Sequence, residues 1–375
     1  MSITAPHSVS RIPMFDPEPA LRRAEAAIDR NVADMRAAGQ YILGAQVRSF
    51  EAELAAAFGA GYAVGAGSGT AAIELCLREA GVVRREQEVI VPAFTSLFTA
   101  QAVLAAGASL RFADVDAGTL LLTPEAVRRA WTKQTAAVLC VHLYGNVCRL
   151  DQLAAICQER RAVLVQDACQ AHGATFGGRP LTDFSPCTAY SFYPTKNLGC
   201  LGDGGAVVTN SSRVARRIRL LRDGGRNGDQ LARAPGINSR LDEIHACYLR
   251  ALLPHLAHWA THRRGAGDVC DRILHGCEGA RPVTSSGESA RHLYVIRAAR
   301  RAALREALAS RGIETGVHYP VALHRHPAFR KRATWLETPL EAERAAAEVV
   351  SLPSGPHVTE EEAAHIAGLV RSLSR

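Results

Sequence analysis

The chain has 375 residues, of which 47% are hydrophobic and 21% are charged, a balance typical of globular proteins and not of disordered or fibrous ones. This length exceeds what one small core needs, so it predicts a large domain plus a smaller one. The net charge of +8 is spread along the chain rather than gathered in one block, which argues against a nucleic-acid-binding protein.

The ten cysteines follow no disulfide or metal-binding spacing and mostly sit inside apolar runs, where a thiol behaves as a small hydrophobe. We therefore expect no metal site. The opening MSITAPHSVSRIPMFDPEP lacks the apolar core of a signal peptide, and no apolar run reaches transmembrane length. These features predict a cytoplasmic protein with no membrane contact.

The first part of the chain predicts an irregular arm over residues 1–18, two helices, and then strands that alternate with helices. The predicted helices are 19–39, 45–59, 69–81, 97–107, 123–132 and 150–161. The predicted strands are 62–67, 88–94, 109–116, 135–145, 162–168, 187–193 and 205–210. Such alternation predicts an α/β fold with a mostly parallel sheet covered by helices on both faces.

The remainder of the chain follows a different pattern, which begins with a long helical stretch over about 241–275. Strands are then predicted at 291–299 and 313–320, and helices at 301–312 and 359–373. We interpret residues 19–250 as a large α/β domain. Residues 251–375 are interpreted as a linking helix followed by a small α+β domain.

Three polar features fall at the carboxyl ends of predicted strands, where open α/β sheets bind their ligands. The first is GAGSGTAA, residues 65–72, which fits either an ordinary turn with a helix cap or a phosphate site at a helix start. The second is Asp167, a carboxylate that closes a largely apolar strand and calls for a cationic partner. The third is Lys196 in SFYPTKNLGCLGDGG, which is either a solvated strand-end residue or a lysine at a pocket floor with a lowered pKa.

These three features together fit one ligand, pyridoxal 5′-phosphate. The lysine amine forms a Schiff base with its aldehyde, the carboxylate keeps its ring nitrogen protonated, and the helix start receives its phosphate. Each feature is ordinary alone, but their order along one sheet favours this cofactor.

Several sequence blocks, which include the three features above, give the chain a wider resemblance. From about residue 13 to the C-terminus it resembles the DegT/StrS-type nucleotide-sugar aminotransferases of the fold-type I pyridoxal phosphate superfamily. The blocks are GSGTAA, VPAFT, FADVD, VHLYG, QDACQAHGA, SFYPTKNLGCLGDGG, NSRLDEIHA, GVHYPVALH and SLPSGPHVT. The resemblance implies a fold-type I aminotransferase that uses pyridoxal 5′-phosphate, with pyridoxamine 5′-phosphate as its intermediate form.

The resemblance also implies roles for particular residues. The implied cofactor contacts are Gly69, Thr70, Ala71, Asp167, Gln170, Ser191, Lys196 and Asn238. Lys196 would be the Schiff-base lysine and the acid–base that moves a proton during catalysis. Asp167 would pair with the pyridinium nitrogen, and Gln170 would reach the cofactor hydroxyl. Asn238 would complete the phosphate site of the other subunit, which implies an obligatory homodimer.

The implied substrate contacts are Tyr193, Arg226, His318, Tyr319 and His324. The histidines of HYPVALHRHPAF also fit a structural loop, and their irregular spacing disfavours a metal site.

The chain departs from the family pattern at two places that bear on ligand binding. Ser96 stands where an aromatic residue usually stacks on the pyridine ring, so Phe94 or Phe98 would substitute for it. Asp229 stands where a basic residue is common, and Arg226 would compensate.

Within the family, NLGCLGDGG resembles the wording of enzymes that act on 3-keto or 2-keto nucleotide sugars. We expect amino transfer, with L-glutamate as donor, to a dTDP-linked 3-keto-6-deoxyhexose of the kind used in antibiotic or surface-glycan biosynthesis. The alternatives are a 4-keto sugar, a cyclitol ketone, or a non-catalytic regulatory protein on the same scaffold. Lysine at position 196 argues against the related sugar dehydratases, which carry histidine there.

Overall fold

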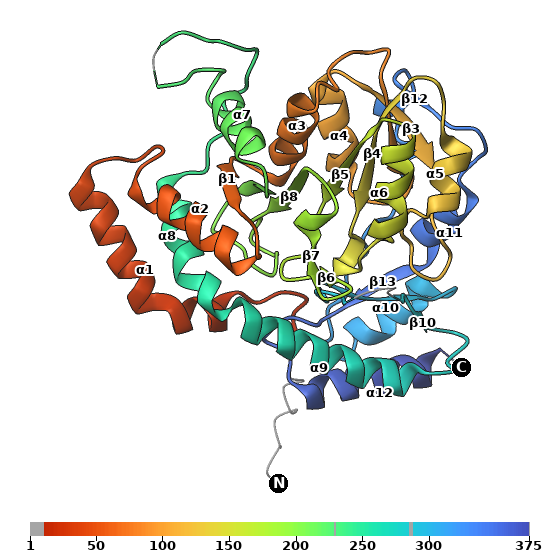
Figure 1. The fold of residues 1–375 in the computed structure, drawn as a ribbon. Coiled ribbons are helices and arrows are strands. Elements are labelled where there is room, and N and C mark those ends of the chain that lie inside the picture. Colours follow the sequence, from red (N-terminus) through yellow and green to blue (C-terminus); the bar gives the residue numbers. More distant parts are fainter. Residues whose placement is uncertain (1–10, 229, 285–287, 375) are drawn as a thin grey trace.

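The computed structural model describes residues 11–228, 230–284 and 288–374, and eight of the strands in these ranges form one sheet (Figure 1). The order across the sheet is β1-β9-β8-β5-β4-β2-β3-β12. Neighbouring strands from β8 to β12 run parallel, whereas β9 runs antiparallel to both β8 and β1. Asp229 lies outside the described residues.

The elements have the following bounds. The strands are β1 Tyr62–Ala66, β2 Glu88–Pro92, β3 Ser109–Ala113, β4 Thr135–Val141, β5 Val163–Asp167, β6 Thr175–Phe176, β7 Arg179–Pro180, β8 Cys187–Ser191, β9 Gly205–Thr209, β10 Arg281–Pro282, β11 Tyr294–Arg297, β12 Ala333–Thr334 and β13 Val349–Leu352. The helices are α1 Glu18–Ala38, α2 Ala45–Ala57, α3 Gly69–Glu79, α4 Leu97–Ala106, α5 Pro124–Ala130, α6 Leu150–Glu159, α7 Ser212–Arg222, α8 Glu243–Leu252, α9 Leu256–Leu274, α10 Arg301–Ala309, α11 Leu340–Glu348 and α12 Glu360–Leu373.

The helices between parallel strands cover both faces of the large sheet. Helices α3 and α4 pack against each other, as do α5 and α6, and the two pairs lie on opposite faces (Figure 1). This arrangement follows from right-handed crossovers, because the chain reverses its direction across the sheet after β3. The predicted α/β fold is confirmed, and the parallel order brings the carboxyl ends of β5 and β8 to one edge.

The C-terminal part contains a second sheet and a second apolar core. Strands β10, β11 and β13 form an antiparallel sheet, and a separate hydrophobic cluster joins α9, α10 and α12. Helices α9 and α12 lie side by side at the base of the molecule (Figure 1). The predicted helical stretch over 241–275 consists of α8 and α9, separated by a 3-10 turn at Pro254.

Two parts of the C-terminal prediction are wrong in detail. No strand forms over 313–320, where the described residues pair only through isolated bridges at Ile313 and Gly316. Strand β13 was not predicted. Strand β12 adds to the edge of the large sheet beside β3, so residues 251–375 do not pack as an isolated body. The division at residue 250 stays a prediction.

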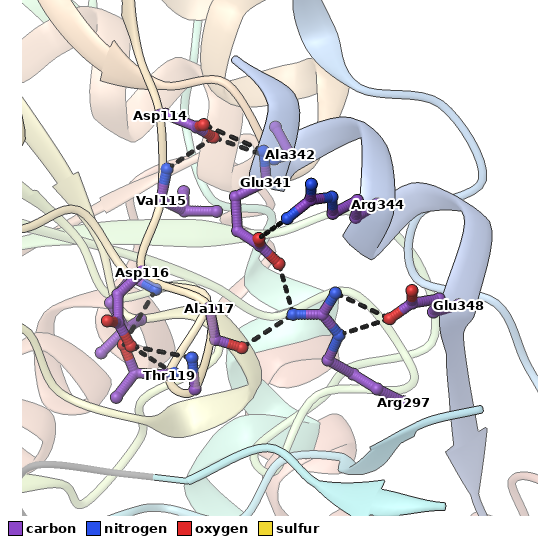
Figure 2. A network of polar contacts seen from close by, with 12 residues as sticks. Asp114, Val115, Asp116, Ala117, Thr119, Arg297, Glu341, Ala342, Arg344 and Glu348 are labelled. Atoms are coloured by element: carbon purple, nitrogen blue, oxygen red, sulfur yellow. Dashed lines mark hydrogen bonds and ion pairs between the residues drawn. The ribbon is translucent and has the colours of Figure 1, made fainter. Parts of the chain in front are cut away.

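A polar network fixes α11 to the large domain (Figure 2). The carboxylate of Asp114, in the block FADVD, accepts hydrogen bonds from the backbone N–H groups of Glu341 and Ala342 (both 2.9 Å) at the start of α11. Arg297 of β11 donates to the carbonyl of Ala117 (2.8 Å) and pairs with Glu341 and Glu348. Because Arg297 is buried and doubly paired, its charge is compensated in place.

Within the described ranges, none of the helices is long and apolar enough to cross a membrane.

Candidate active site

A cavity of about 650 Å³ lies at the carboxyl ends of β5 and β8, between the large sheet and the C-terminal part. Asp167 ends β5, Ser191 ends β8, and Lys196 follows β8 in the next turn. Gly69 and Thr70 reach the same cavity from the start of α3. The structure therefore brings together the three features that the sequence placed at strand ends.

The start of α3 is held tightly against the end of β8. A Cβ atom on Gly69 would lie 2.6 Å from Ser191 Cβ and 2.7 Å from Cys169 Sγ, so only glycine fits there. Among the described residues, no hydrogen-bond acceptor takes the N–H of Gly69 or Thr70, as expected for the first turn of a helix. These two amides, at the positive end of the helix dipole, suit a phosphate.

The predicted cofactor contact of Ala71 stays a prediction. Its backbone N–H donates to Ser68 Oγ (3.1 Å), which caps α3, and Ala71 does not line the cavity.

Asp167 is buried, and its carboxylate is oriented by two hydrogen bonds. The hydroxyl of Thr99 donates to Oδ2 (2.8 Å), and the N–H of Cys169 donates to Oδ1 (3.1 Å). A carboxylate in this setting favours a cation in the cavity, such as a protonated ring nitrogen.

Lys196 is half-buried in the cavity wall, and its backbone N–H donates to the carbonyl of Tyr193 (2.9 Å) within a turn. Desolvation in the cavity lowers the pKa of its amine, while the thiol of Cys169 and the carboxylate of Asp167 act in the opposite direction. The net shift increases the fraction of neutral, nucleophilic amine at a given pH.

The glycines after Lys196 are required by close backbone approach. A Cβ on Gly199 would lie 2.6 Å from the carbonyl oxygen of Pro194, and one on Gly205 would lie 2.4 Å from that of Ser68. The glycine run therefore folds the lysine turn back on itself and packs the start of β9 against the start of α3.

Gln170, His318 and Tyr319 line the same cavity. Gln170 accepts from the N–H of Tyr144 (2.6 Å) and donates to the hydroxyl of Tyr319 (3.1 Å). Burial lowers the pKa of His318 to about 4, helped by the charge of Lys196, so this imidazole is neutral at pH 7. Burial raises the pKa of Tyr319 to about 12, so its hydroxyl stays protonated.

The other predicted site residues divide into two groups. Tyr193 lines the cavity and is 50% exposed, whereas Arg226, Asn238 and His324 do not line it. Arg226 pairs with Asp223 in the segment that projects between α7 and α8 (Figure 1), and His324 is buried against Glu343 (2.7 Å).

Asn238 is exposed and pairs with Asp223 through an isolated bridge just after α7. Its expected place is in the site of a second subunit, so it stays a prediction.

For the position where the family pattern has a stacking aromatic, the structure distinguishes the two candidates. Phe98 lines the cavity beside Ser96, whereas Phe94 is buried in the core.

The buried cavity residues that sequence reasoning missed include Arg263 of α9 and His292. Neither lies in a recognisable motif or at a strand end of the large sheet, so no sequence signal indicated them.

A second cavity, of about 710 Å³, lies beside α9 and β10, and its described lining includes none of the predicted site residues. No group of three or more His, Cys, Asp or Glu side chains that could hold a metal occurs in the part of the chain that the structure describes.

Comparisons with known proteins agree with this geometry. Residues 22–371 match the model of the DegT/DnrJ/EryC1/StrS aminotransferase family. The chain is 39% identical to a dTDP-3-amino-3,4,6-trideoxy-alpha-D-glucose transaminase of Streptomyces venezuelae, over 96% of each chain. It is 36% identical to a pleiotropic regulatory protein of Geobacillus stearothermophilus, over 97% of this chain and 99% of the other. It superposes on the crystal structure of S. venezuelae DesV in complex with a ketimine intermediate with a TM-score of 0.93 and 38% identity, covering 97% and 99% of the two chains.

Proposed function

Because the chain belongs to the DegT/DnrJ/EryC1/StrS aminotransferase family and is a pyridoxal-phosphate-dependent sugar aminotransferase, we propose that it aminates a dTDP-linked 3-keto-6-deoxyhexose, with L-glutamate as amino donor. The net reaction exchanges an amino group for a carbonyl oxygen, which yields an amino sugar nucleotide and 2-oxoglutarate. The observation that carries the proposal is the full-length similarity to a transaminase whose name specifies a dTDP-3-amino sugar.

In this proposal the residues of the cavity divide the binding of the cofactor among them. Lys196 would hold it through Nζ and would carry the proton that is moved during transfer. The amides of Gly69 and Thr70, together with Ser191, bind the phosphate. Pyridoxal 5′-phosphate supplies the electron sink for the carbon that gains or loses nitrogen.

Asp167 keeps the ring nitrogen of the cofactor protonated, since its carboxylate is already oriented by Thr99 and the N–H of Cys169. Gln170 would contact the cofactor hydroxyl, and hydrogen bonds with Tyr144 and Tyr319 orient its amide. His318, Tyr319 and Tyr193 are the proposed contacts of the hexose.

We further propose a homodimer in which Asn238 of one subunit completes the phosphate site of the other. The exposed position of Asn238, which pairs with Asp223 just after α7, supports this arrangement.

The deciding experiment supplies the purified enzyme with L-glutamate and, separately, a 3-keto dTDP-sugar, a 4-keto dTDP-sugar and an inosose. NMR then locates the new C–N bond. Amination at C3 supports the proposal, whereas amination only at C4, or only of the cyclitol, refutes it.

The name of one relative describes regulation, so the experiment includes a test of catalysis itself. Bleaching of the visible cofactor band by glutamate is expected. A band that glutamate leaves unchanged would point to a non-catalytic protein instead.

A further inference from the structure

Arg263 is a buried cation without a carboxylate partner. It lies on α9, is 5% exposed, and lines the same cavity as Lys196. Its Nη1 donates to the carbonyl oxygens of His292 (3.0 Å) and Ser354 (3.3 Å), while its Nε is fully buried and has no hydrogen-bond partner. None of the ion pairs between described residues includes it.

The other buried arginines show what this position lacks. Arg222 is paired with Glu51, and Arg297 is paired with both Glu341 and Glu348. Burying an uncompensated guanidinium is costly, whereas burying a paired one is tolerated. Desolvation lowers the pKa of Arg263 to about 10, so the group remains charged at neutral pH. Its charge is therefore available for an anion that enters the cavity.

The neighbouring His292 does not supply a positive charge for such an anion. Asn197 donates its amide to the carbonyl of Ala290, so its Oδ1 faces His292 and fixes Nδ1 of that ring as the donor (3.0 Å). Burial and the charges of Lys196 and Arg263 lower the pKa of His292 well below its usual value, so the ring is neutral. Among the described lining residues, the one other Lys or Arg side chain is Lys196, which would hold the cofactor.

The proposed phosphate site lies in another part of the cavity lining, at the start of α3. The wall that carries Arg263 is built from the C-terminal part of the chain and includes Leu293, His318 and Gly355. A Cβ on Gly355 would lie 2.6 Å from the ring of His357 and 3.8 Å from Nη2 of Arg263, so Gly355 and His357 both border the guanidinium. A small anion that reaches this wall would thus lie in the same cavity as Lys196.

We propose that Arg263 binds a carboxylate of the amino-acid donor. This inference rests on the proposed function, because it assigns the donor half of that reaction to a particular cation. Charge-assisted hydrogen bonds to a guanidinium are strong and geometrically specific, so Arg263 would select amino acids over simple amines.

Equilibrium binding provides the first test. Glutarate, a dicarboxylate with no amino group, is titrated calorimetrically into the holoenzyme. Arg263→Gln is expected to weaken glutarate binding by on the order of 10- to 100-fold, and Arg263→Lys by less. Arg264→Gln is the matched control, since Arg264 is the next residue of α9 and borders the other cavity. Equal glutarate affinity in wild type and Arg263→Gln would overturn the proposal.

The two half-reactions provide the second test. Arg263→Gln should lose the glutamate half-reaction, yet keep the reaction of the pyridoxamine-phosphate-loaded enzyme with the keto sugar. Equal losses in both halves would indicate a purely structural role and overturn the proposal. Weakened binding of cofactor or dTDP, with glutarate binding intact, would do the same by assigning the anion to a phosphate.

A measurement on the wild-type enzyme covers the case in which the variants do not fold. Glutarate should compete with glutamate and not with the sugar nucleotide, and a failure to compete with glutamate would overturn the proposal. If instead no keto sugar is aminated while glutarate still binds through Arg263, the proposed acceptor is wrong and this inference stands.

Discussion

The substitution Gly69→Ala tests whether the close contact between α3 and β8 builds a phosphate site. The added Cβ would lie 2.6 Å from Ser191 Cβ, so reaching a normal contact of about 3.4 Å requires a shift of about 0.8 Å. Both neighbours, Ser191 and Cys169, are packed at strand ends and cannot move away freely. Overpacking of this kind costs roughly 1–3 kcal/mol of unfolding free energy.

The same shift moves the amides of Gly69 and Thr70 away from a bound phosphate. Urea unfolding of the apoenzyme measures the stability, and absorbance titrations compare pyridoxal 5′-phosphate with pyridoxal, which has no phosphate. We expect lower stability and a larger loss of affinity for the phosphorylated form. Gly368→Ala is the matched control, because its position on α12 is open and should gain about 0.5–1 kcal/mol. Unchanged preference for the phosphorylated form in Gly69→Ala would refute the phosphate assignment.

Three further substitutions test other parts of the structure. Lys196→Ala should abolish the visible cofactor band and turnover while leaving the protein folded; near-normal activity would exclude the assignment. In the apoenzyme, the pKa of Lys196 is lower in the folded than in the unfolded chain, so the unfolded chain binds the proton more readily. The contribution of Lys196 to the free energy of unfolding therefore falls as the pH decreases from about 10.5 toward the folded pKa. Urea titrations of the Lys196→Ala apoenzyme should lack that part of the pH dependence. Asp167→Asn should bind cofactor but lose most turnover, and normal steady-state rates would contradict the role of Asp167. The same substitution should lower the pKa of Lys196 further, because the carboxylate of Asp167 raises that pKa. Asp114→Ala removes the cap of α11 and should cost about 1–2 kcal/mol in urea unfolding, with pyridoxal 5′-phosphate affinity as the control; unchanged stability would contradict the cap.

Much of the large domain could be predicted from sequence, because its signals are local. Strands such as Val163–Asp167 are short apolar runs closed by a polar residue, and the helices between them show clear periodicity. Parallel topology then places the ends of neighbouring strands together. For that reason Asp167 and Lys196 were found without knowledge of any distance, whereas Ser191 was implied by the resemblance to the family.

The C-terminal wall of the cavity could not be predicted in the same way. Residues 313–320 alternate as a strand does, but the backbone forms isolated bridges and directs His318 and Tyr319 into the cavity. What holds these side chains are groups far away in the sequence, such as Ser351 for His318 and Gln170 for Tyr319. Periodicity carries no information about such partners.

Arg263 shows why the missed residues belong to function rather than to fold. A buried arginine needed only for stability is expected beside a carboxylate, as Arg222 and Arg297 are. Arg263 has backbone carbonyls instead, which satisfy some N–H groups but leave the net charge uncompensated. A transaminase binds a new amino donor in every catalytic cycle. A cation that is not paired with a protein carboxylate can bind the carboxylate of each donor in turn. In the proposal, the carboxylate that pairs with Arg263 is that of the amino donor.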